Sequence, residues 1–465
     1  MKRMLPVISR IMVFCGMTLA AGSCSAQSGG IGGADAVTDS LIAASQAGAM
    51  PVFFDPGSPQ TSLVAPGSFK DDGECRVRGG LSGFFDKAEA GKPLTIGFIG
   101  GSITRADGMY RNQAAKFIQH LYPAVKIKAV NAGIAGTGTD LGACRIREQL
   151  LKYHPDLVFI EFAVNGAFRP GMEGIIRQIR KCDPNTDICL LYTIAGEQSR
   201  IYARGQIPPN IRGLEEIAAY YHLPSVHMGM EAAMLQKQGK LLWKADTSVP
   251  GKIVFSKDGT HPLETGGDLY AKAIARALLK IRQAGIPQKQ AHPLPPPLLD
   301  DNWEDACMLD PREAATFSSG WKAVDPAGVP LLQSFKPWFP YIMAADTPGA
   351  SFTFRFRGTM VGVFDIGGPG SGQLLLTVDG KTVKQINRFN RYCNNRYRGQ
   401  CEFITLPPGL HTVRFSISPV KADKAAILGP GQQQDITRHP EKYDRTAELL
   451  GKLLIRGTVV VSDAL

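Results

Sequence analysis

The sequence predicts two folded domains, an α/β domain with a parallel five-stranded sheet and, after it, a C-terminal β-sandwich. Three observations predict this class of fold. The chain has 465 residues, more than one hydrophobic core usually supports. Apolar runs alternate with amphipathic stretches between Pro93 and Gly285, and beyond residue 298 the apolar period shortens to two. The proline-rich run 292–297 separates the two patterns, because it is stiff and cannot continue a helix.

The first part of the chain repeats the order strand, helix, strand. Five apolar runs have the length of buried strands, at 94–100, 126–131, 156–162, 187–194 and 224–228. Amphipathic stretches indicate helices at 112–121, 141–153, 172–181, 213–221 and 264–282. This repetition is typical of a parallel sheet covered on both faces, which binds its ligands at the carboxyl ends of the strands.

The second part, residues 298–465, has the pattern of antiparallel strands. Apolar and polar residues alternate over 352–357 and again over 411–418, and turn pairs such as Asp379-Gly380 separate such runs. The pattern predicts a mostly antiparallel β-sandwich. Four aromatic side chains of this domain either stack on sugar rings or fill its core, namely Trp321, Trp338, Tyr341 and Tyr392.

Residues 1–26 have the composition of an export signal, with a basic start and an apolar run that is too short to span a bilayer. The stretch Ala21-Gly22-Ser23-Cys24 resembles a bacterial lipoprotein cleavage site, which would lipidate Cys24 and attach the protein to a membrane. Cleavage near Ala26 would instead give a periplasmic or secreted protein. In both cases the mature chain is exported, and residues 27–70 are predicted to be a flexible tether.

The formal net charge of +11 has two interpretations. It favours acidic substrates such as uronate-containing glycans, or it is only a solvated surface. No run of like charges and no basic-aromatic stripe points to nucleic acid.

The cysteines fit an oxidising compartment. Past Cys24 there are seven of them, and two pairs are close enough in sequence for local disulfides, Cys182 with Cys189 and Cys393 with Cys401. Cys144 lies in a helical pattern and is expected to be a buried apolar residue. No cysteine or histidine cluster has the spacing of a zinc site, and the sequence predicts no metal and no cofactor.

Residues with useful chemistry follow the ends of the predicted strands. Ser102 follows the first strand, the glycine-rich loop 131–139 follows the second, and Asn165 follows the third. Asp258 and His261 stand three residues apart before the last helix, a spacing that lets the carboxylate orient the imidazole. Each feature alone is typical of an ordinary turn, but four of them at one edge of a sheet predict a catalytic centre.

These residues carry a resemblance to the SGNH (GDSL-like) hydrolases. The matching blocks read Gly-Gly-Ser-Ile-Thr, Asn-Ala-Gly-Ile-Ala-Gly-Thr, Phe-Ala-Val-Asn and Asp-Gly-Thr-His-Pro, and the resemblance covers residues 76–282. It implies a flavodoxin-like, three-layer α/β hydrolase domain over residues 71–290, with a jelly-roll-like accessory domain over 298–465.

The resemblance also implies roles for single residues. Ser102 would be the nucleophile, Gly136 and Asn165 would donate to an oxyanion hole, and His261 with Asp258 would be the base and its orienting acid. The backbone N–H of Ser102 would be a third oxyanion donor.

The chain departs from the family pattern at two positions. The usual aspartate before the serine is Gly101, as in a branch of glycan-active members. The aspartate that often follows the asparagine is Gly166, which puts the hydrogen bonding beneath the oxyanion hole in question.

The expected activity is that of a serine esterase that removes acyl groups, above all O-acetyl groups, from a polysaccharide or oligosaccharide. The substrate class comes from the resemblance to carbohydrate acetylesterases with an added β-sandwich. Two alternatives stay open. A non-catalytic glycan-binding lipoprotein would have a degenerate hydrolase domain, and an acyltransferase would use the same serine with a sugar hydroxyl replacing water. No segment has the character of a lipase lid.

Overall fold

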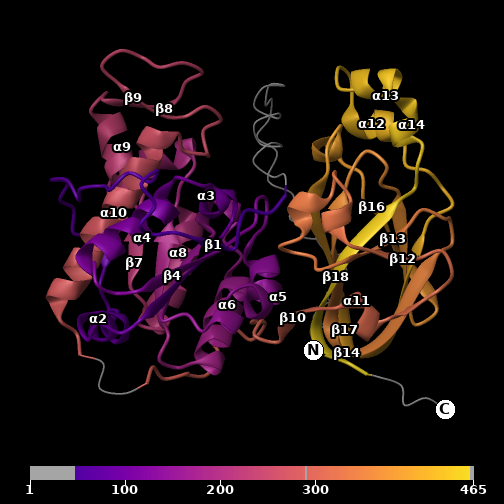
Figure 1. Ribbon diagram of the computed structural model, residues 1–465, viewed down its shortest axis with the longest axis horizontal. Helices are drawn as coiled ribbons and strands as arrows, with labels where there is room; N and C mark the ends of the chain where they lie inside the picture. Colours follow the sequence, from indigo (N-terminus) through magenta and orange to yellow (C-terminus); the bar gives the residue numbers. More distant parts are fainter. Residues whose placement is uncertain (1–47, 288–290, 461–465) are drawn as a thin grey trace, which may run out of the picture.

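The computed structural model describes residues 48–287 and 291–460, which form two domains lying side by side (Figure 1). An α/β domain with a seven-stranded sheet precedes a β domain with a nine-stranded sheet. The predicted export signal, Cys24 and the first part of the predicted tether lie outside the described residues. Within the described ranges, no helix is long and apolar enough to cross a membrane.

The sheet of the α/β domain has the strand order β1-β4-β3-β5-β6-β7-β2. Its five central strands are parallel and match the five predicted runs: β3 (Leu94–Gly100), β4 (Ile127–Gly133), β5 (Leu157–Glu161), β6 (Asp187–Tyr192) and β7 (Ser225–His227). The predicted parallel sheet is therefore confirmed. Across the sheet these five strands follow one another in the order β4, β3, β5, β6 and β7. Numbered along the chain, this is the order 2-1-3-4-5 of flavodoxin-like folds.

Short antiparallel strands close both edges of this sheet. β1 (Phe53–Phe54) pairs with β4, and β2 (Cys75–Arg76) pairs with β7. The prediction of a tether up to residue 70 is therefore wrong for its described part, because β1 is a strand of the sheet. Lys116 also donates to the carbonyl oxygens of Ser58 and Thr61, which fastens the following loop to the domain.

Helices cover both faces of the sheet. They are α2 (Ser82–Glu89), α4 (Tyr110–Leu121), α5 (Thr139–Gln149), α6 (Arg169–Cys182), α8 (Pro209–Tyr220) and α10 (Glu264–Ala284). α4 packs against α10, whereas α5 packs against α6 and α6 against α8. All of them except α2 match predicted helices. The strands between these layers are almost wholly buried, as their continuous apolar runs predict.

A small lobe stands above the carboxyl edge of the sheet, at the top left of Figure 1. It contains η3 (Gly196–Gln198), α7 (Ser199–Tyr202), α9 (Met230–Lys237) and the parallel strands β8 (Leu241–Lys244) and β9 (Ile253–Ser256). No pattern in the sequence predicts this lobe. Its role in the fold is to hold the turn that contains Asp258 and His261, since β9 ends two residues before Asp258.

The β domain consists of antiparallel strands, as predicted. They are β10 (Ala306–Leu309), β11 (Thr316–Phe317), β12 (Lys322–Val324), β13 (Ile342–Ala345), β14 (Ser351–Gly367), β15 (Gln373–Val378), β16 (Lys381–Asn387), β17 (Arg398–Ile417) and β18 (Glu448–Val459). Hydrogen bonds join them into one continuous sheet, because the long strands β14 and β17 pair along their whole length. Phe352, Phe354 and Phe356 are buried on one face, which confirms the period of two.

The helical parts of the β domain are short. They are α11 (Pro311–Ala314), η4 (Pro326–Gly328), η5 (Gln333–Phe335), η6 (Arg391–Cys393) and three helices between β17 and β18, namely α12 (Lys424–Leu428), α13 (Gln434–Arg438) and α14 (Pro440–Tyr443). Figure 1 shows α12, α13 and α14 together at the end of the β domain that lies level with the small lobe.

The two domains share one continuous apolar core. Trp303, just before β10, packs edge-on against Phe168 of the α/β domain and Phe403 of the β domain, and it fills the space beside Gly174 of α6. Glu173 of α6 accepts hydrogen bonds from the backbone of Leu298 and Leu299. The connection after the proline-rich run is therefore built into the interface.

The predicted local disulfides are wrong, because all seven described cysteines are free thiols. Cys182 is exposed at the end of α6, whereas Cys189 is buried inside β6, so closeness in sequence does not bring the two thiols together. Cys393 contacts Gln400, while Cys401 on the opposite face of β17 packs toward the shared core. Cys144 is buried, as expected.

Candidate active site

Ser102 is the first residue of α3 (Ser102–Arg105), a short helix that follows β3 directly. The turn before it is closely packed around two glycines. A Cβ on Gly100 would lie 2.0 Å from Oγ1 of Thr104, and a Cβ on Gly101 would lie 2.2 Å from Oδ1 of Asn165. At Gly100 the backbone oxygen of Glu161 would also lie 2.5 Å from the Cβ and excludes a side chain, whereas at Gly101 the amide of Asn165 would have to move. Asn165 therefore occupies the space that a side chain at position 101 would need.

The structure brings Ser102, His261 and Asp258 into one hydrogen-bonded chain. Oγ of Ser102 lies 2.7 Å from Nε2 of His261, and Nδ1 of His261 lies 2.5 Å from Oδ2 of Asp258. A carboxylate at Nδ1 favours the tautomer with its proton there, which leaves Nε2 free to accept the proton of the serine. This is the geometry of a nucleophile, its general base and the acid that orients the base.

Asp258 is held in its charged form. Burial opposes ionisation, but hydrogen bonds from His261 and from the backbone N–H groups of Thr260 and His261 outweigh it and keep the pKa below the ordinary value. Oδ1 of Asp258 accepts from these two N–H groups at 2.9 and 2.8 Å and from the hydroxyl of Ser256 at 2.8 Å. A fully bonded carboxylate in a fixed position is what an orienting acid requires.

The small lobe fixes the turn that contains this pair. The indole N–H of Trp243 donates to the carbonyl of Gly259 at 2.8 Å, and the backbone N–H of Gly196 donates to the same oxygen at 2.9 Å. Trp243 stacks on Phe255 of β9 with ring centroids 4.2 Å apart. These residues escape sequence reasoning, because nothing in their local pattern indicates what they support.

Asn165 ends η2 (Ala163–Asn165), the turn that follows β5, and its side chain lies against Gly101. No hydrogen bond to a described residue engages its amide. A free carboxamide beside the serine turn is available to a ligand. Gly166 is exposed with a φ of 91°, a left-handed conformation that favours glycine, so the second departure is explained by backbone geometry.

Gly136 lies in the loop after β4 and is exposed with a φ of 69°. The loop is docked beside the serine turn, since the N–H of Ile134 donates to the carbonyl of Gly100 and the hydroxyl of Thr137 donates to the carbonyl of Ile134. Ser102, Asn165 and the Gly136 loop therefore stand at neighbouring strand ends, as the sequence predicts.

A buried polar network beneath α3 is not anticipated from the sequence. Glu161, the last residue of β5, is fully buried and accepts hydrogen bonds from the hydroxyls of Thr104 and Thr193 at 2.8 and 2.5 Å. The hydroxyls of Thr104 and Tyr110 lie 2.7 Å apart. Burial raises the pKa of Glu161 against the opposing effect of these hydrogen bonds. The network ties α3 to the ends of β5 and β6.

Arg145 is a second such residue. It is fully buried in α5, and its guanidinium donates to the carbonyl oxygens of Ala132 at 2.5 Å and of Gly100 at 3.1 Å. Burial lowers the pKa of this side chain to about 9. Because these two carbonyls lie at the ends of β4 and β3, Arg145 braces both strand ends under the serine turn.

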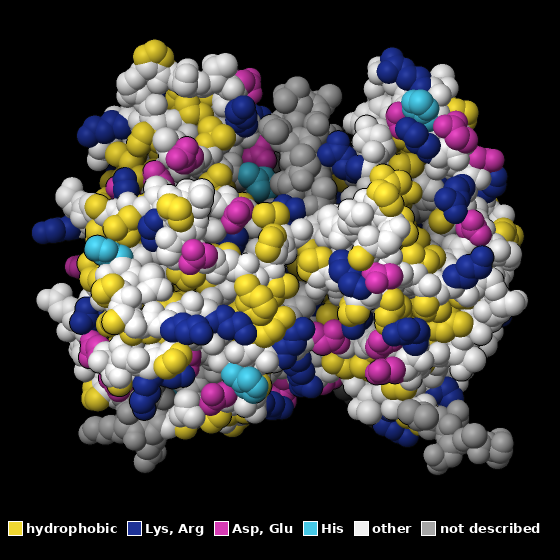
Figure 2. Space-filling view, viewed as in Figure 1, with side chains coloured by type: hydrophobic (Ala, Val, Ile, Leu, Met, Phe, Trp, Pro, Cys, Tyr) yellow, Lys and Arg dark blue, Asp and Glu magenta, His cyan; other side chains and the backbone are white. Residues whose placement is uncertain are grey.

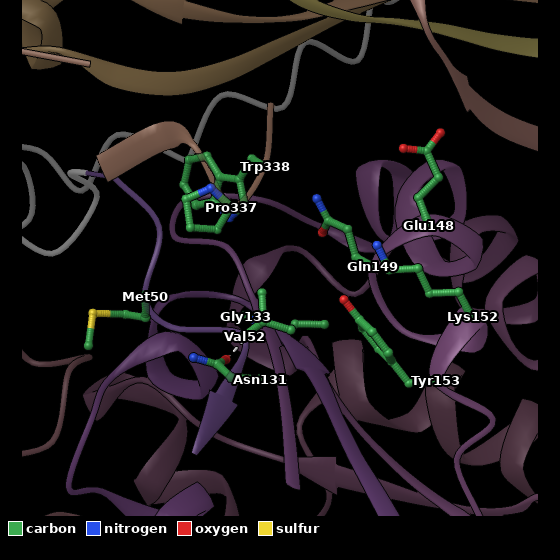
Figure 3. Close-up of a pocket in the computed structure, with 11 residues that line it drawn as sticks. Met50, Val52, Asn131, Gly133, Glu148, Gln149, Lys152, Tyr153, Pro337 and Trp338 are labelled. Atoms are coloured by element: carbon green, nitrogen blue, oxygen red, sulfur yellow. Dashed lines mark hydrogen bonds between the residues drawn. The ribbon is translucent and has the colours of Figure 1, made fainter. Parts of the chain in front are cut away.

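A small pocket lies where the α/β domain meets the β domain (Figure 3). Asn131 and Gly133 of β4 form one wall, and Pro337 with Trp338 of the β domain form another. Gly133 also adjoins the end of α3, because a Cβ on it would lie 2.4 Å from the backbone nitrogen of Arg105. The pocket therefore links the edge of the candidate active site to the β domain.

Two solved structures resemble both domains together. A two-domain esterase active on acetylated mannans, co-crystallised with mannopentaose, aligns with 86% of this chain and 100% of its own, at a TM-score of 0.64 and 20% identity. A second structure of a two-domain esterase active on acetylated mannans aligns with 81% of this chain and 96% of its own, at a TM-score of 0.61 and 20% identity.

An acetylxylan esterase from Geobacillus stearothermophilus aligns with 40% of this chain and 94% of its own, at 22% identity and a TM-score of 0.31. No protein-family model and no curated protein matches the chain. In fold, the chain resembles these two-domain esterases, with an α/β domain followed by a β domain.

Proposed function

We propose that this protein is a serine esterase that removes O-acetyl groups from a polysaccharide or oligosaccharide. The observation that carries the proposal is the chain of hydrogen bonds from Ser102 through His261 to Asp258, at the carboxyl edge of the sheet. The two-domain fold shared with esterases active on acetylated mannans supports the substrate class.

The first half-reaction forms an acetyl-enzyme. Nε2 of His261 takes the proton of Ser102 while Oγ attacks the carbonyl carbon of the ester. The negative charge that develops on the carbonyl oxygen is stabilised by the backbone N–H groups of Ser102 and Gly136 and by the amide N–H of Asn165. The tetrahedral intermediate then expels the sugar oxygen, which takes the proton from His261.

The second half-reaction releases acetate. A water molecule gives a proton to His261 and attacks the acetyl carbon on Ser102, and the same three donors stabilise the second oxyanion. The intermediate collapses, acetate leaves, and Ser102 recovers its proton from the imidazole. Asp258 stays ionised throughout and stabilises the imidazolium that forms twice in each cycle.

Acetate release from acetylated mannan, xylan and pectin oligosaccharides tests the proposal. The wild type should release acetate from at least one of them, and Ser102→Ala should lower the rate by about 10⁴-fold or more because the nucleophile is gone. Circular dichroism of the variant controls for folding. A wild type that binds these glycans and releases no acetate would instead support a glycan-binding protein with a degenerate hydrolase domain.

A further inference from the structure

The segment 388–398 of the β domain has an unusual composition. It contains four arginines and three aromatic residues and no acidic residue, in the order Arg-Phe-Asn-Arg-Tyr-Cys-Asn-Asn-Arg-Tyr-Arg. The charge of the chain as a whole does not reveal this cluster. On the face in Figure 2, Lys and Arg side chains are interspersed with Asp and Glu rather than gathered in one patch.

Arg398 has no partner for its charge among the described residues. Its side chain is only 8% exposed, its Nε is buried without a hydrogen bond, and no hydrogen bond or ion pair to the described part of the chain involves its guanidinium. Its one aromatic contact is the ring of Tyr392, with the guanidinium carbon 5.2 Å from the ring centroid. A buried cation without an anion is costly, by several kcal/mol in typical proteins.

Arg388, at the other end of the segment, is a buried arginine that has a carboxylate partner. Its Nε and one terminal nitrogen bind both carboxylate oxygens of Asp365, at 2.7 and 2.5 Å. Burial alone would lower the pKa of Arg388, yet Asp365 raises it above the ordinary value. For Arg398, burial lowers the pKa, and the neighbouring charges do not compensate. The pKa values of the two arginines shift in opposite directions because Arg388 has a carboxylate partner and Arg398 has none.

The position of Arg398 connects it to the candidate active site. The next residue, Gly399, lies against the ring of Trp338, which lines the interdomain pocket together with Gly133 (Figure 3). Two residues further along β17, Cys401 lies within electrostatic range of Asp140 at the start of α5. The backbone of Arg398 therefore lies one residue from the interdomain pocket, whereas its side chain points to the face of β17 that it shares with Gln400, opposite Gly399 and Cys401.

We propose that Arg398 and Tyr392 form a subsite for the carboxylate of a uronic acid residue in the acetylated glycan. A guanidinium binds a carboxylate through two parallel hydrogen bonds, as Arg388 does with Asp365. The ring of Tyr392 offers the flat apolar face that sugar rings pack against. This subsite rests on the proposed esterase function and narrows its substrate to acidic glycans.

Kinetics of Arg398→Gln test the subsite, with Arg396→Gln as the matched control from the same segment. Arg396 donates a hydrogen bond to the neighbouring Asn395 and is half exposed. Its substitution therefore removes the same charge from the segment but leaves the proposed subsite intact. For acetylated uronate-containing oligosaccharides, Arg398→Gln should raise KM about tenfold or more with kcat unchanged, whereas Arg396→Gln should not. Both variants should hydrolyse acetylated mannooligosaccharides and 4-nitrophenyl acetate at the wild-type rate. Equal losses on acidic and neutral substrates, or no loss on either, would overturn the subsite.

Calorimetric titration of Ser102→Ala with unacetylated glucuronate or galacturonate oligosaccharides separates this proposal from the esterase proposal. Binding should be present, and it should be lost in the double variant Ser102→Ala with Arg398→Gln, whether or not the wild type releases acetate. Inorganic sulfate should bind at least tenfold more weakly than the uronate. Equal affinity for sulfate and uronate, or uronate binding that persists in the double variant, would contradict the subsite.

Discussion

Two buried charged side chains, Asp258 in the α/β domain and Arg398 in the β domain, have opposite surroundings. Asp258 accepts hydrogen bonds from His261, from two backbone N–H groups and from a serine hydroxyl. Arg398 donates no side-chain hydrogen bond to the described residues. Where the fold supplies every partner, the group is fixed for chemistry on another molecule. Where a partner is missing, the group is suited to receive one from the ligand.

Removing the carboxylate of Asp258 should produce the largest effect on activity. Asp258→Asn places an amide opposite Nδ1 of His261, which favours the wrong tautomer, so kcat should fall by about 10⁴-fold while the fold stays intact. Steady-state kinetics with 4-nitrophenyl acetate and a thermal melt measure the two quantities. Retention of more than a tenth of wild-type activity would show that His261 does not depend on this partner.

The comparison also predicts opposite stability effects for the two arginines of the segment 388–398. Arg388→Gln leaves Asp365 buried without its cation and should destabilise the protein by about 3 to 5 kcal/mol. Without ligand, Arg398→Gln should leave the stability unchanged or increase it, because it removes an unpaired buried charge. Urea unfolding of both variants measures the difference. A large loss of stability in Arg398→Gln would indicate that the protein itself satisfies this side chain.

Loss of the free amide of Asn165 should affect turnover and leave stability almost unchanged. If Asn165 donates to the oxyanion, Asn165→Ala should raise the barrier by on the order of 3 kcal/mol, a loss of about 100-fold in kcat. Gly101→Asp should displace the same side chain, because a Cβ there meets Oδ1 at 2.2 Å. In the double variant the two losses should therefore not add. Additive losses would show that Gly101 and Asn165 act separately.

The smallest effect concerns Glu161 and pH. Burial raises its pKa in the folded protein, whereas glutamates of the unfolded chain titrate near about 4.3. The stabilisation from its bound proton is complete below that pH and is lost as the pH rises through the folded-state pKa. Glu161→Gln is neutral at every pH and should lack this loss. Its free energy of unfolding relative to the wild type should therefore increase between about pH 4 and pH 8, and a constant or falling difference would contradict the assignment.

The sequence predicts the strand ends of the α/β domain well, for a physical reason. Parallel strands with helices between them must present their carboxyl ends at one edge, so Ser102, Asn165 and the Gly136 loop are brought together by topology alone. Asp258 and His261 are only three residues apart, and their pairing is a local property of one turn. Periodicity and short-range spacing are sufficient for these features.

The missed features depend on contacts between residues far apart in the chain. β1 and β2 are two residues long and have no periodicity of their own. Arg145 lies in a predicted helix, but only the fold shows that it reaches the ends of β3 and β4. The disulfide prediction failed for the same reason, because spacing in sequence does not fix the direction of a thiol. The missing partner of Arg398 becomes visible only once the neighbouring side chains are placed.

Trapping the acetyl-enzyme tests the central claim most directly. The wild type is mixed with excess 4-nitrophenyl acetate, and the reaction is quenched in acid before the substrate is used up. The protein is then digested and analysed by mass spectrometry. The account predicts one acetyl group on the peptide that contains Ser102, with no such adduct in Ser102→Ala. Hydrolysis without an adduct on Ser102, or an adduct on a different residue, would contradict it.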